Sequence, residues 1–560
     1  MTIPTAVAAT VNRESINQAA RNAAFQAVSR VSIAATPLVS YRSSGRLLIT
    51  GEADQALALS AELRDRGLQC YVLARGEGVA QAKGDVPLLF LNRSSDLRIT
   101  GHLGEFVVTL ATTEQGEVNV AALIGAPSPH FDLILDLGVP PLLAWDVPPL
   151  GYYAPGADAA KLEQALAELP AMIGEFEKAQ FFHYDPDICA HGDSGLKGCT
   201  RCLEVCPTGA IISSGDRIQV DPYYCQGAGS CATACPTSAI SYRYPAPADT
   251  LNRLRVLLRA YREQGGDDPS VLFHDAEGGR ECLAQRATAL PGQVLAIEIE
   301  EVGSVGMEVW LAALAYGASR VGVLTAAKTP ASVLGEIRQQ WVFAHALLAG
   351  MGYLPGVLAL LDTAEEDPLS AFMTTEPMPP IKPAGFAGAS GKRDNLYFAI
   401  DHLASQTSPP NPVISLPEPA PFGEIEVNRT ACTLCLACVS VCPASALFDS
   451  PDAPRLEFVE ANCVQCGLCE RACPENAVTR HPRFLFAPDQ RRQRRLLNED
   501  AVFYCLSCGK PFAPRRLIDS MKAKLEGHWM FQDEAAIRRL QLCGDCRVRD
   551  MFAAGGGVPR

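Results

Sequence analysis

Eight cysteines in the C-terminal half of the chain fall into two runs of identical spacing, C-x2-C-x2-C-x3-C-P. Each cysteine of the first run recurs 31 residues later in the second. Three thiolates at steps of three residues can wrap a loop around three irons of a 4Fe–4S cube, and in paired runs the fourth thiolate ligates the cluster of the other run. We therefore predict one cluster bound by Cys432, Cys435, Cys438 and Cys473, and a second bound by Cys463, Cys466, Cys469 and Cys442.

An earlier block of cysteines repeats this pattern with one ligand missing from each half. The two halves are offset by 29 residues, and each ends in Cys-Pro. Leu196 stands where the first half requires a cysteine, and Ala228 stands where the second half does. Cys189 can loop back past the flexible segment HGDSG to supply the first missing thiolate. The cysteines in register are Cys199, Cys202 and Cys206, followed by Cys225, Cys231 and Cys235.

The missing ligands predict two different centres in this earlier block. One is a 4Fe–4S cluster held by Cys189, Cys199, Cys202 and Cys235. The other has three thiolates, which leave one iron of a cube without a cysteine and favour a 3Fe–4S cluster or an open-site cube. Its ligands are Cys225, Cys231 and Cys206. The alternative is that Cys282 or His191 completes a four-ligand cluster.

All four sites of the fourth cysteine share a short local repeat, which reads CPTGAI, CPTSAI, CPASAL and CPENAV. A small alanine followed by an aliphatic residue lets the backbone approach a cluster and shields the cluster from water, and solvent access is one determinant of its potential. Two modules of two half-repeats each are therefore the main internal repeat of the chain.

Two further C-x2-C pairs lie near the C-terminus, Cys505 with Cys508 and Cys543 with Cys546. Two such pairs are typical of a closed, structural zinc site with four thiolates. The segment between them predicts two helices, around RRLIDSMKAKL and EAAIRRLQL. A further iron site and a redox dithiol are the alternatives.

Composition limits the class of protein. The 560 residues include 21 cysteines and carry a formal net charge of -14, so metal-bound thiolates in a reducing compartment are expected and nucleic acid is not an obvious partner. No apolar run is long enough for a membrane helix, which predicts a cytoplasmic protein without an anchor. The segment Asn12–Ser32 fits a transit-peptide pattern as the alternative. The basic run Arg491–Arg495 predicts a solvated connector or a docking site for an acidic partner.

Two cysteine-poor regions alternate strands and helices, which predicts two α/β domains with mostly parallel sheets. The first has strands at residues 46–50, 70–74, 106–111 and 131–138, a helix at 53–67, and a last helix over 161–179. The second, from Asp249 to about Gln406, has helices at 252–265, 307–317 and 331–352 and strands at 271–275, 294–300 and 319–325.

These observations predict a multi-domain protein of class α/β plus α+β. Its predicted parts are an N-terminal helical or flexible segment 1–42, an α/β domain 43–180, a degenerate ferredoxin-like module 181–246, an α/β domain 247–407, a proline-rich linker 408–421, an intact ferredoxin-like module 422–482, an arginine-rich connector 483–500 and a zinc-ribbon-like four-cysteine domain 501–560.

The segment GFAGASGK, which ends at Lys392, has glycines like a phosphate loop, but its spacing is one residue too long and Arg393 stands where Ser or Thr is required. We therefore predict no nucleotide site there. No G-x-G-x-x-G follows a predicted strand, so neither α/β domain shows a dinucleotide fingerprint.

Residues Cys432 to Pro474 match bacterial two-cluster ferredoxins in every ligand. The whole arrangement, with EIEEVGSVGMEVWLAALAYGASRVGVL between the modules, resembles the group of electron-transfer proteins formed by the heterodisulfide-reductase flavoprotein and the hydrogenase delta subunit. Similar proteobacterial ferredoxin-type proteins are associated with formate dehydrogenase systems. The chain departs from that group because it lacks the flavin fingerprint of the heterodisulfide-reductase flavoprotein and the middle-domain cysteines of the delta subunit.

The function predicted from these features is single-electron transfer along several clusters, as a subunit coupled to a dehydrogenase, hydrogenase or reductase rather than as a stand-alone enzyme. One alternative is a catalytic oxidoreductase with a flavin or substrate in an α/β domain. Another is an assembly or redox-sensing factor for a metalloenzyme.

Overall fold

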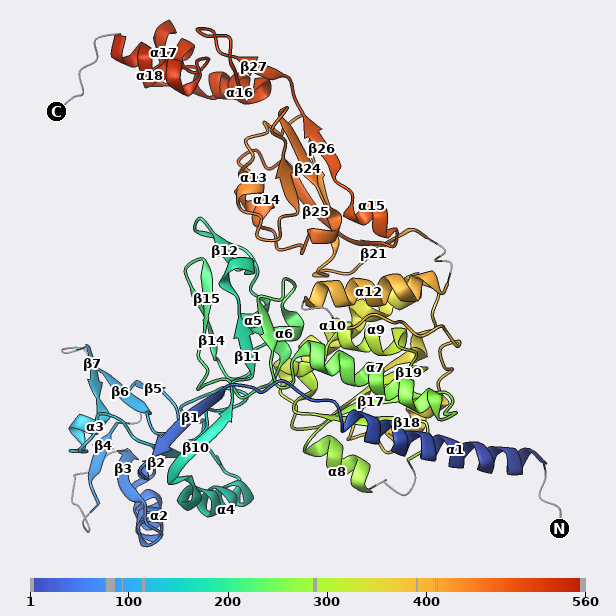
Figure 1. Cartoon of the computed structure of the whole chain (residues 1–560). Helices are drawn as coiled ribbons and strands as arrows, with labels where there is room; N and C mark the ends of the chain where they lie inside the picture. The colour runs from blue at the N-terminus through green and yellow to red at the C-terminus, as the bar shows by residue number, and fades with distance from the viewer. Residues whose placement is uncertain are drawn as a thin grey trace.

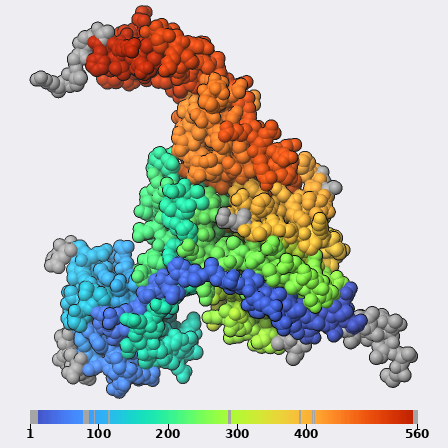
Figure 2. Space-filling model, viewed as in Figure 1, coloured from blue at the N-terminus to red at the C-terminus, as the bar shows by residue number. Residues whose placement is uncertain are grey.

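A computed structural model describes residues 5–553 except 77–85, 93, 113–115, 286–289, 389–390, 408 and 410, with side chains described from residue 12. Figure 1 shows two α/β domains side by side at one end of the molecule, with the cysteine-rich modules beyond and between them. The space-filling view shows the C-terminal part projecting away from the remaining domains (Figure 2).

The first α/β domain is built on a parallel sheet of order β4-β3-β2-β8-β9. Its aliphatic strands are buried on both faces, as expected for a parallel sheet covered by other elements. The strand that we expected at residues 106–111 is β6, and it lies in a separate antiparallel sheet of order β5-β6-β7. The elements are β2 (Arg46–Gly51), α2 (Ala53–Asp65), β3 (Gln69–Arg75), β4 (Leu88–Leu91), β5 (Leu97–Thr100), β6 (Val107–Thr112), β7 (Gly116–Asn119), α3 (Val120–Leu123), β8 (Leu133–Asp136) and β9 (Tyr152–Tyr153).

The helix predicted over residues 161–179 is wrong in its second half. Helix α4 (Ala159–Glu168) ends in a short 3-10 turn, and β10 (Gly174–Ala179) follows and pairs antiparallel with β1 (Leu38–Ser43). Pro170 lies in that turn; proline has no N–H to donate and its ring clashes with the preceding helical turn. The alternating residues after it then form a strand.

The second α/β domain has a parallel sheet of order β18-β17-β19-β20, and its predicted strands and helices are confirmed. Helix α9 (Met307–Ala315) is buried along its whole length and packs against α12 (Lys392–Ser405). The other elements are α7 (Pro247–Glu263), β17 (Ser270–Asp275), α8 (Gly278–Gln285), β18 (Val294–Ile299), β19 (Arg320–Thr325), α10 (Ala331–Gly350), β20 (Leu358–Asp362) and α11 (Pro368–Thr374).

The N-terminal helix α1 (Thr5–Val28) lies along α7 of this second domain, and the chain then crosses to the first domain (Figure 1). Ala20 and Ala24 join the core of the second domain, and the Arg21 guanidinium donates to the Pro291 carbonyl oxygen at 3.0 Å. The first helix thus belongs structurally to a domain that begins more than 200 residues later.

Two small modules carry the ferredoxin-like cysteines. Module 1 consists of hairpins and very short helices: β11 (Phe182–Tyr184), β12 (Gly192–Asp193), β13 (Leu196–Lys197), α5 (Arg201–Glu204), β14 (Ile211–Ser214), β15 (Arg217–Val220), α6 (Ser230–Ala234) and β16 (Ile240–Tyr242). Module 2 contains β22 (Gly423–Val427), α13 (Ala437–Ser440), β23 (Leu447–Asp449), β24 (Arg455–Phe458), α14 (Leu468–Ala472) and β25 (Val478–Leu485).

The expected linker and connector around module 2 are parts of its fold. Strand β21 (Val413–Ser415) pairs with β25, and β26 (Arg495–Glu499) pairs with β24. In α15 (Pro488–Arg492), Arg491 is 1% exposed, pairs with Asp401 at 2.7 Å and stacks on Tyr397. The prediction of a solvated basic connector is therefore wrong for Arg491, because a buried guanidinium needs a bonded carboxylate and this one has it.

The C-terminal part contains β27 (Val502–Tyr504), β28 (Pro511–Pro514), α16 (Arg515–Leu525), α17 (Glu534–Arg539) and α18 (Gly544–Ala553). Helices α16 and α17 confirm the two helices expected between the cysteine pairs. None of the helices in the described ranges is long and apolar enough to cross a membrane.

Candidate iron–sulfur and metal centres

Module 2 gathers its eight cysteines around two small cavities. One cavity is lined by Cys432, Cys435, Cys438 and Cys473, with Leu456 and Val478 beside them. The other is lined by Cys442, Cys463, Cys466 and Cys469, with Ile425 and Phe458. The fourth cysteine of each run thus lies with the first three of the other run, and these are the two groups that the crossed rule assigns to two clusters.

The backbone of each ligand loop in module 2 turns around its cavity. The residues two and four positions after the first cysteine have positive φ, at Leu434 and Leu436 in one loop and Gln465 and Gly467 in the other. Alternation of right- and left-handed residues directs successive N–H groups into a concave, anion-binding arrangement. Left-handed leucine is costly, by about 1–2 kcal/mol per residue, so the loop is held in this form by its surroundings.

The second half of module 1 keeps this loop although it lacks one thiol. Gly227 and Gly229 have φ of 82° and 76°, at the same two positions after Cys225. Ala228 lies between them, where the intact loops have a cysteine. Only the side chain has been lost at this site, and the backbone of a ligand loop is retained.

The first half of module 1 has a different backbone. Leu196 lies in β13, which pairs with β12 in a hairpin, and Thr200 has φ of -121°. Cys189, which follows a 3-10 turn at Pro186–Ile188, approaches the remaining cysteines instead. Burial raises the pKa of the Cys202 thiol, and three neighbouring thiolates raise it further, namely Cys235, Cys199 and Cys189. Cys202 thus lies near the three other cysteines that were expected to share its cluster.

The remaining thiols of module 1 form a group of three. Burial raises the pKa of Cys231 well above its usual value, and the negative charges of the Cys225 and Cys206 thiolates raise it further. Lys178, from β10, donates to the carbonyl oxygens of Tyr223 and Cys225 at 2.9 and 2.7 Å, and burial lowers its pKa to about 8. Sequence reasoning missed this cation, because no spacing links β10 to a cysteine 47 residues later.

Neither His191 nor Cys282, the two alternative ligands, is placed to serve as a fourth ligand beside these three thiols. Both ring nitrogens of His191 are bonded, Nδ1 to the Cys199 carbonyl oxygen at 2.9 Å and Nε2 to Ser213 Oγ at 2.7 Å. Cys282 packs in the core beside Leu272 and Phe372 in the second α/β domain. Neither side chain is therefore suited to be a fourth ligand beside Cys206, Cys225 and Cys231.

The four Cys-Pro repeats share one backbone feature. The third residue after the fourth cysteine has positive φ in every case, at Gly209, Ser238, Ser445 and Asn476. The turn lets the following N–H approach the thiol: Ala446 N lies 3.3 Å from Cys442 Sγ, and Ala477 N lies 3.2 Å from Cys473 Sγ. Such N–H donors stabilise thiolate and tune a bound cluster.

The two modules touch each other beside one group of cysteines from each, through the segment Leu196–Gly198 and helix α14. Burial raises the pKa of Cys199 to about 11, and the thiolates of Cys235 and of Cys466 in module 2 add to the shift. A Cβ on Gly198 would lie 2.8 Å from the Leu468 side chain, and the Arg471 guanidinium donates to the Lys197 carbonyl oxygen. Strand β13 and helix α14 therefore form a close junction between the modules.

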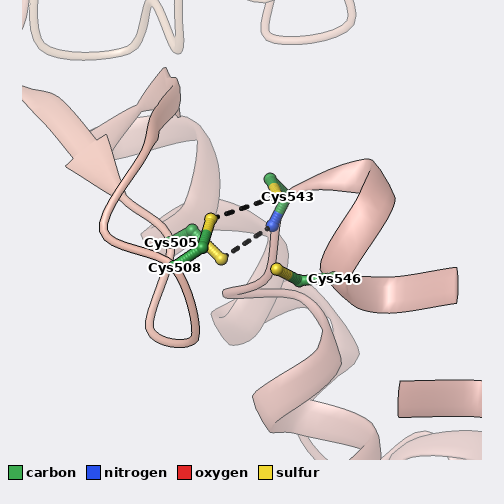
Figure 3. A group of neighbouring side chains, drawn as sticks. All are labelled: Cys505, Cys508, Cys543 and Cys546. Atoms are coloured by element: carbon green, nitrogen blue, oxygen red, sulfur yellow. Dashed lines mark hydrogen bonds between the residues drawn. The ribbon is translucent and has the colours of Figure 1, made fainter. Parts of the chain in front are cut away.

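The C-terminal cysteines form a tighter group. The Sγ atoms of Cys505, Cys508, Cys543 and Cys546 all lie within 4.8 Å of one another. Cys505 and Cys508 lie between β27 and β28, and Cys543 and Cys546 lie at the start of α18 (Figure 3).

The spacing of these four thiols suits a single ion. Two thiolates at ~2.3 Å from a tetrahedral ion are about 3.8 Å apart, and Cys508 Sγ lies 3.7 Å from Cys543 Sγ. Burial opposes ionisation of Cys505, but backbone N–H donors, including that of Cys543, lower its pKa to about 6.

The ferredoxin cysteines are arranged more widely. Across the described residues, no other group of three or more Cys, His, Asp or Glu side chains lies as close together as the C-terminal four. In module 2, the wider spacing of the thiols around a cavity fits the larger iron–sulfur cube, whose four irons each take one thiolate. The donor sets of both modules therefore fit iron–sulfur clusters, and the C-terminal set fits zinc.

Both cysteine modules match a known class of domain. Residues 431–478 and residues 182–236 each match the sequence profile of the 4Fe-4S dicluster domain. The chain therefore carries two dicluster ferredoxin-type domains, and an electron-transfer role follows from them.

Individual relatives agree with that class over short stretches. An uncharacterized ferredoxin of Methanocaldococcus jannaschii is 39% identical over 54 residues, which cover 70% of that protein and 9% of this chain. Over this part of its length the chain belongs to the ferredoxins.

Two larger relatives match over less of their length. The archaeal-type glutamate synthase [NADPH] of Thermotoga maritima is 40% identical over 55 residues, 11% of its length and 10% of this chain. Subunit I of the NADH-quinone oxidoreductase of Pelobacter propionicus is 36% identical over 62 residues, 33% of its length and 9% of this chain. The chain thus spans about a tenth of the first of these relatives and a third of the second.

Proposed function

We propose that the chain is a polyferredoxin that relays single electrons between redox partners through four iron–sulfur centres. The proposed ligand sets, in order along the relay, are Cys206, Cys225 and Cys231; then Cys189, Cys199, Cys202 and Cys235; then Cys442, Cys463, Cys466 and Cys469; and finally Cys432, Cys435, Cys438 and Cys473. The first set favours a 3Fe–4S or open-site cluster, and the other three favour 4Fe–4S clusters.

The junction between the modules is the observation that carries this proposal. Strand β13 of module 1 packs on helix α14 of module 2, and the Arg471 guanidinium donates to the Lys197 carbonyl oxygen. The Cys466 thiolate also raises the pKa of Cys199, although the two cysteines belong to different modules. Within module 1, the Cys202 thiolate raises the pKa of Cys231, and within module 2 the Cys438 thiolate raises the pKa of Cys469. Each group of cysteines therefore adjoins the next. Two separate ferredoxins on one chain would not require such contact, whereas a relay does.

The side chains around each group have a defined part in this function. When bound, the clusters supply reversible one-electron transfer. The chain's own residues hold the thiolates in place, direct backbone N–H groups toward sulfur, and exclude water. Ala239, Ala446 and Ala477 are 2–3% exposed and let the backbone lie close to each site. Cys435, in contrast, is exposed and marks the end of the relay where a partner can exchange electrons.

The partner is proposed from resemblance. The chain resembles the group of the heterodisulfide-reductase flavoprotein and the hydrogenase delta subunit, so a dehydrogenase, hydrogenase or reductase is the proposed electron donor or acceptor. One relative is named as a synthase that uses NADPH and another as part of an oxidoreductase, which fits a component of a larger redox system. The α/β domains act as scaffolds, and the C-terminal thiols bind a structural zinc ion.

Metal counts combined with redox titration test the proposal. Protein purified without oxygen should contain about 15 irons, with matching sulfide, and one zinc. Paramagnetic resonance during the titration should show four centres that are reduced and reoxidised reversibly, one of them with the signal of an oxidised 3Fe–4S cluster. About 8 irons would remove module 1 from the relay, and irreversible reduction would contradict electron transfer.

A further inference from the structure

Two consecutive cations at the start of α12 reach into different ferredoxin modules. Lys392 Nζ donates to three carbonyl oxygens at the end of α6 in module 1: those of Ala232 at 3.0 Å, Thr233, and Cys235 at 3.3 Å. Helix carbonyls at a C-terminus attract a cation, so the ammonium is held there by the helix end as well. Lys392 is the last residue of the segment that resembles a phosphate loop. Its ammonium group is bonded to protein carbonyls, so no bound nucleotide is needed to account for its position.

Arg393 makes the equivalent contact with module 2. Its Nη2 donates to the Cys463 carbonyl oxygen at 2.6 Å, and its Nε donates to the Ala461 carbonyl oxygen at 2.8 Å. The guanidinium also stacks on the rings of Tyr397 and Phe422, with centroids 5.0 and 5.1 Å away. A planar guanidinium that is stacked and bonded in this way has little freedom to move, so its charge stays beside Cys463.

The two cysteines contacted belong to the two groups that meet at the junction. Cys235 is in the group with Cys199, and Cys463 is in the group with Cys466. Both cations donate to backbone carbonyls, and within the described residues neither forms an ion pair with a carboxylate. Glu336 is the acidic group that interacts with Lys392, whose charge opposes the rise that burial causes in the pKa of Glu336. The Arg393 guanidinium thus lies beside the backbone of the candidate ligand Cys463, and the Lys392 ammonium lies beside the backbone of the candidate ligand Cys235. Both charges are placed where they can stabilise negative charge on a bound cluster.

We propose that Lys392 and Arg393 are positioning residues that set the reduction potentials of the two inner centres, each acting on its own centre. A reduced cluster carries one more negative charge than its oxidised form, and a nearby cation stabilises the reduced form. Because the two cations are adjacent on one rigid helix, they also fix the spacing of the modules on either side of the junction. This inference rests on the relay proposed above.

The test compares Lys392→Gln and Arg393→Gln in the full chain, by paramagnetic redox titration and iron analysis. At the wild-type midpoint potential, Lys392→Gln should lower the ratio of reduced to oxidised centre about tenfold for the Cys235 group, which corresponds to about 59 mV for a one-electron couple. Arg393→Gln should do the same for the Cys463 group. Cys235→Ser and Cys463→Ser variants identify the signal of each group.

Three further variants separate charge from packing. Lys392→Arg and Arg393→Lys keep the charge and should keep the midpoints near wild type. Arg262→Gln is the matched control, because Arg262 also donates to a backbone carbonyl, that of Gly317, in the core of the second α/β domain. Arg262→Gln should leave the midpoint potential of every centre unchanged. If Lys392→Gln fails to load iron, Arg393→Gln carries the test alone, since its effect falls on a different centre.

The results distinguish this inference from the proposed function. Wild-type protein without iron, or without reversible reduction, would contradict the relay itself. Four reversible centres in wild type whose midpoints do not move in iron-loaded Gln variants would overturn only the role of Lys392 and Arg393. A shift of the same centre by both variants, or an equal shift by Gln and by the charge-keeping variants, would also overturn it.

Discussion

The two positions where module 1 lacks a cysteine differ in kind. At Ala228 the loop backbone of an intact module is retained, and only the thiol is missing. At Leu196 the loop is replaced by a hairpin, and Cys189 is the proposed replacement ligand. The first site therefore has a ligand position of the correct shape without its thiol, whereas the second already has four thiolates.

This difference predicts opposite results for two cysteine substitutions. Ala228→Cys should complete the three-thiol group, raise the iron content from about 15 to about 16 per chain and abolish the 3Fe–4S signal. Leu196→Cys is the matched control and should leave both unchanged. Iron analysis and paramagnetic resonance of oxidised protein measure the outcome. A 3Fe–4S signal that survives in Ala228→Cys would show that this loop does not hold the cluster.

Glu301, which follows β18, gives the second α/β domain a pH-dependent stability. Burial raises its pKa to about 7, with help from the charges of Asp275 and Glu300. A carboxyl whose pKa is raised on folding binds its proton more tightly in the folded state. The contribution of Glu301 to folding stability is therefore fully present below the pKa that it has in the unfolded chain, and is lost as the pH rises through about 7. Ionised Glu301 therefore destabilises the domain at neutral and higher pH.

Replacing Glu301 by Gln should stabilise the chain by about 1–3 kcal/mol at pH 8 and by less at pH 5.5. Thermal unfolding at the two pH values measures the difference. Glu298→Gln, in β18 itself, should act in the opposite direction, because a hydrogen bond from Arg280 lowers the pKa of Glu298. An equal gain at both pH values would mean that ionisation of Glu301 is not the cause.

At the scale of elements, the contact of β13 with α14 determines whether the two modules act together. Gly198 allows this contact because it has no side chain: a Cβ would lie 2.5 Å from the Ala190 carbonyl oxygen and 2.8 Å from Leu468. The backbone carbonyl cannot move aside as a flexible side chain can. The hairpin that replaced a ligand loop thus also forms the surface that meets module 2.

Gly198→Ala should therefore separate the modules at a cost of about 1–3 kcal/mol. The measurement is the magnetic interaction between reduced inner centres, seen as broadening of their resonance lines, which should weaken while the iron content stays near wild type. Gly335→Ala in α10 is the control, because a Cβ there meets nothing within 4 Å and alanine favours the helix. Unchanged broadening in Gly198→Ala would contradict a tight junction.

At the scale of the whole molecule, the second α/β domain holds module 2 through a shared core. Its hydrophobic cluster runs from α9 and α12 into Phe422 and Phe484 of module 2. The four-cysteine part lies at the far end of the chain (Figure 2) and is tied to module 2 by polar contacts, including Lys524 with Glu475 at 2.6 Å. It can thus lose its metal without disturbing the cores that carry the clusters.

Cys543→Ser should accordingly remove the single zinc and expose residues 501–553 to proteolysis, while the iron content stays at about 15 and the four redox midpoints stay unchanged. Zinc analysis and limited proteolysis measure the first part, and titration measures the second. A fall of about four irons in this variant would instead indicate a further cluster at these thiols.

The local features of this protein follow from its amino-acid sequence. Ligand spacing fixes which thiols can reach one cube, as in the crossed sets of Cys432 to Cys473, because the chain between them is short. Alternating apolar patterns likewise predicted both parallel sheets. The segment 161–179 was predicted wrongly in its second half, because the effect of Pro170 on the helix outweighs the helical pattern around it.

Contacts between distant residues, in contrast, depend on how the domains pack. That Cys199 lies near Cys466, that Lys392 and Arg393 contact two modules, and that Arg491 is buried against Asp401 all depend on packing between residues 70 to 267 positions apart. Such contacts arise from the burial of shared apolar surface, which leaves no periodic or spacing signal in the sequence. Local spacing thus predicts the ligand sets, whereas the packing of the domains determines the order of the centres in the proposed relay.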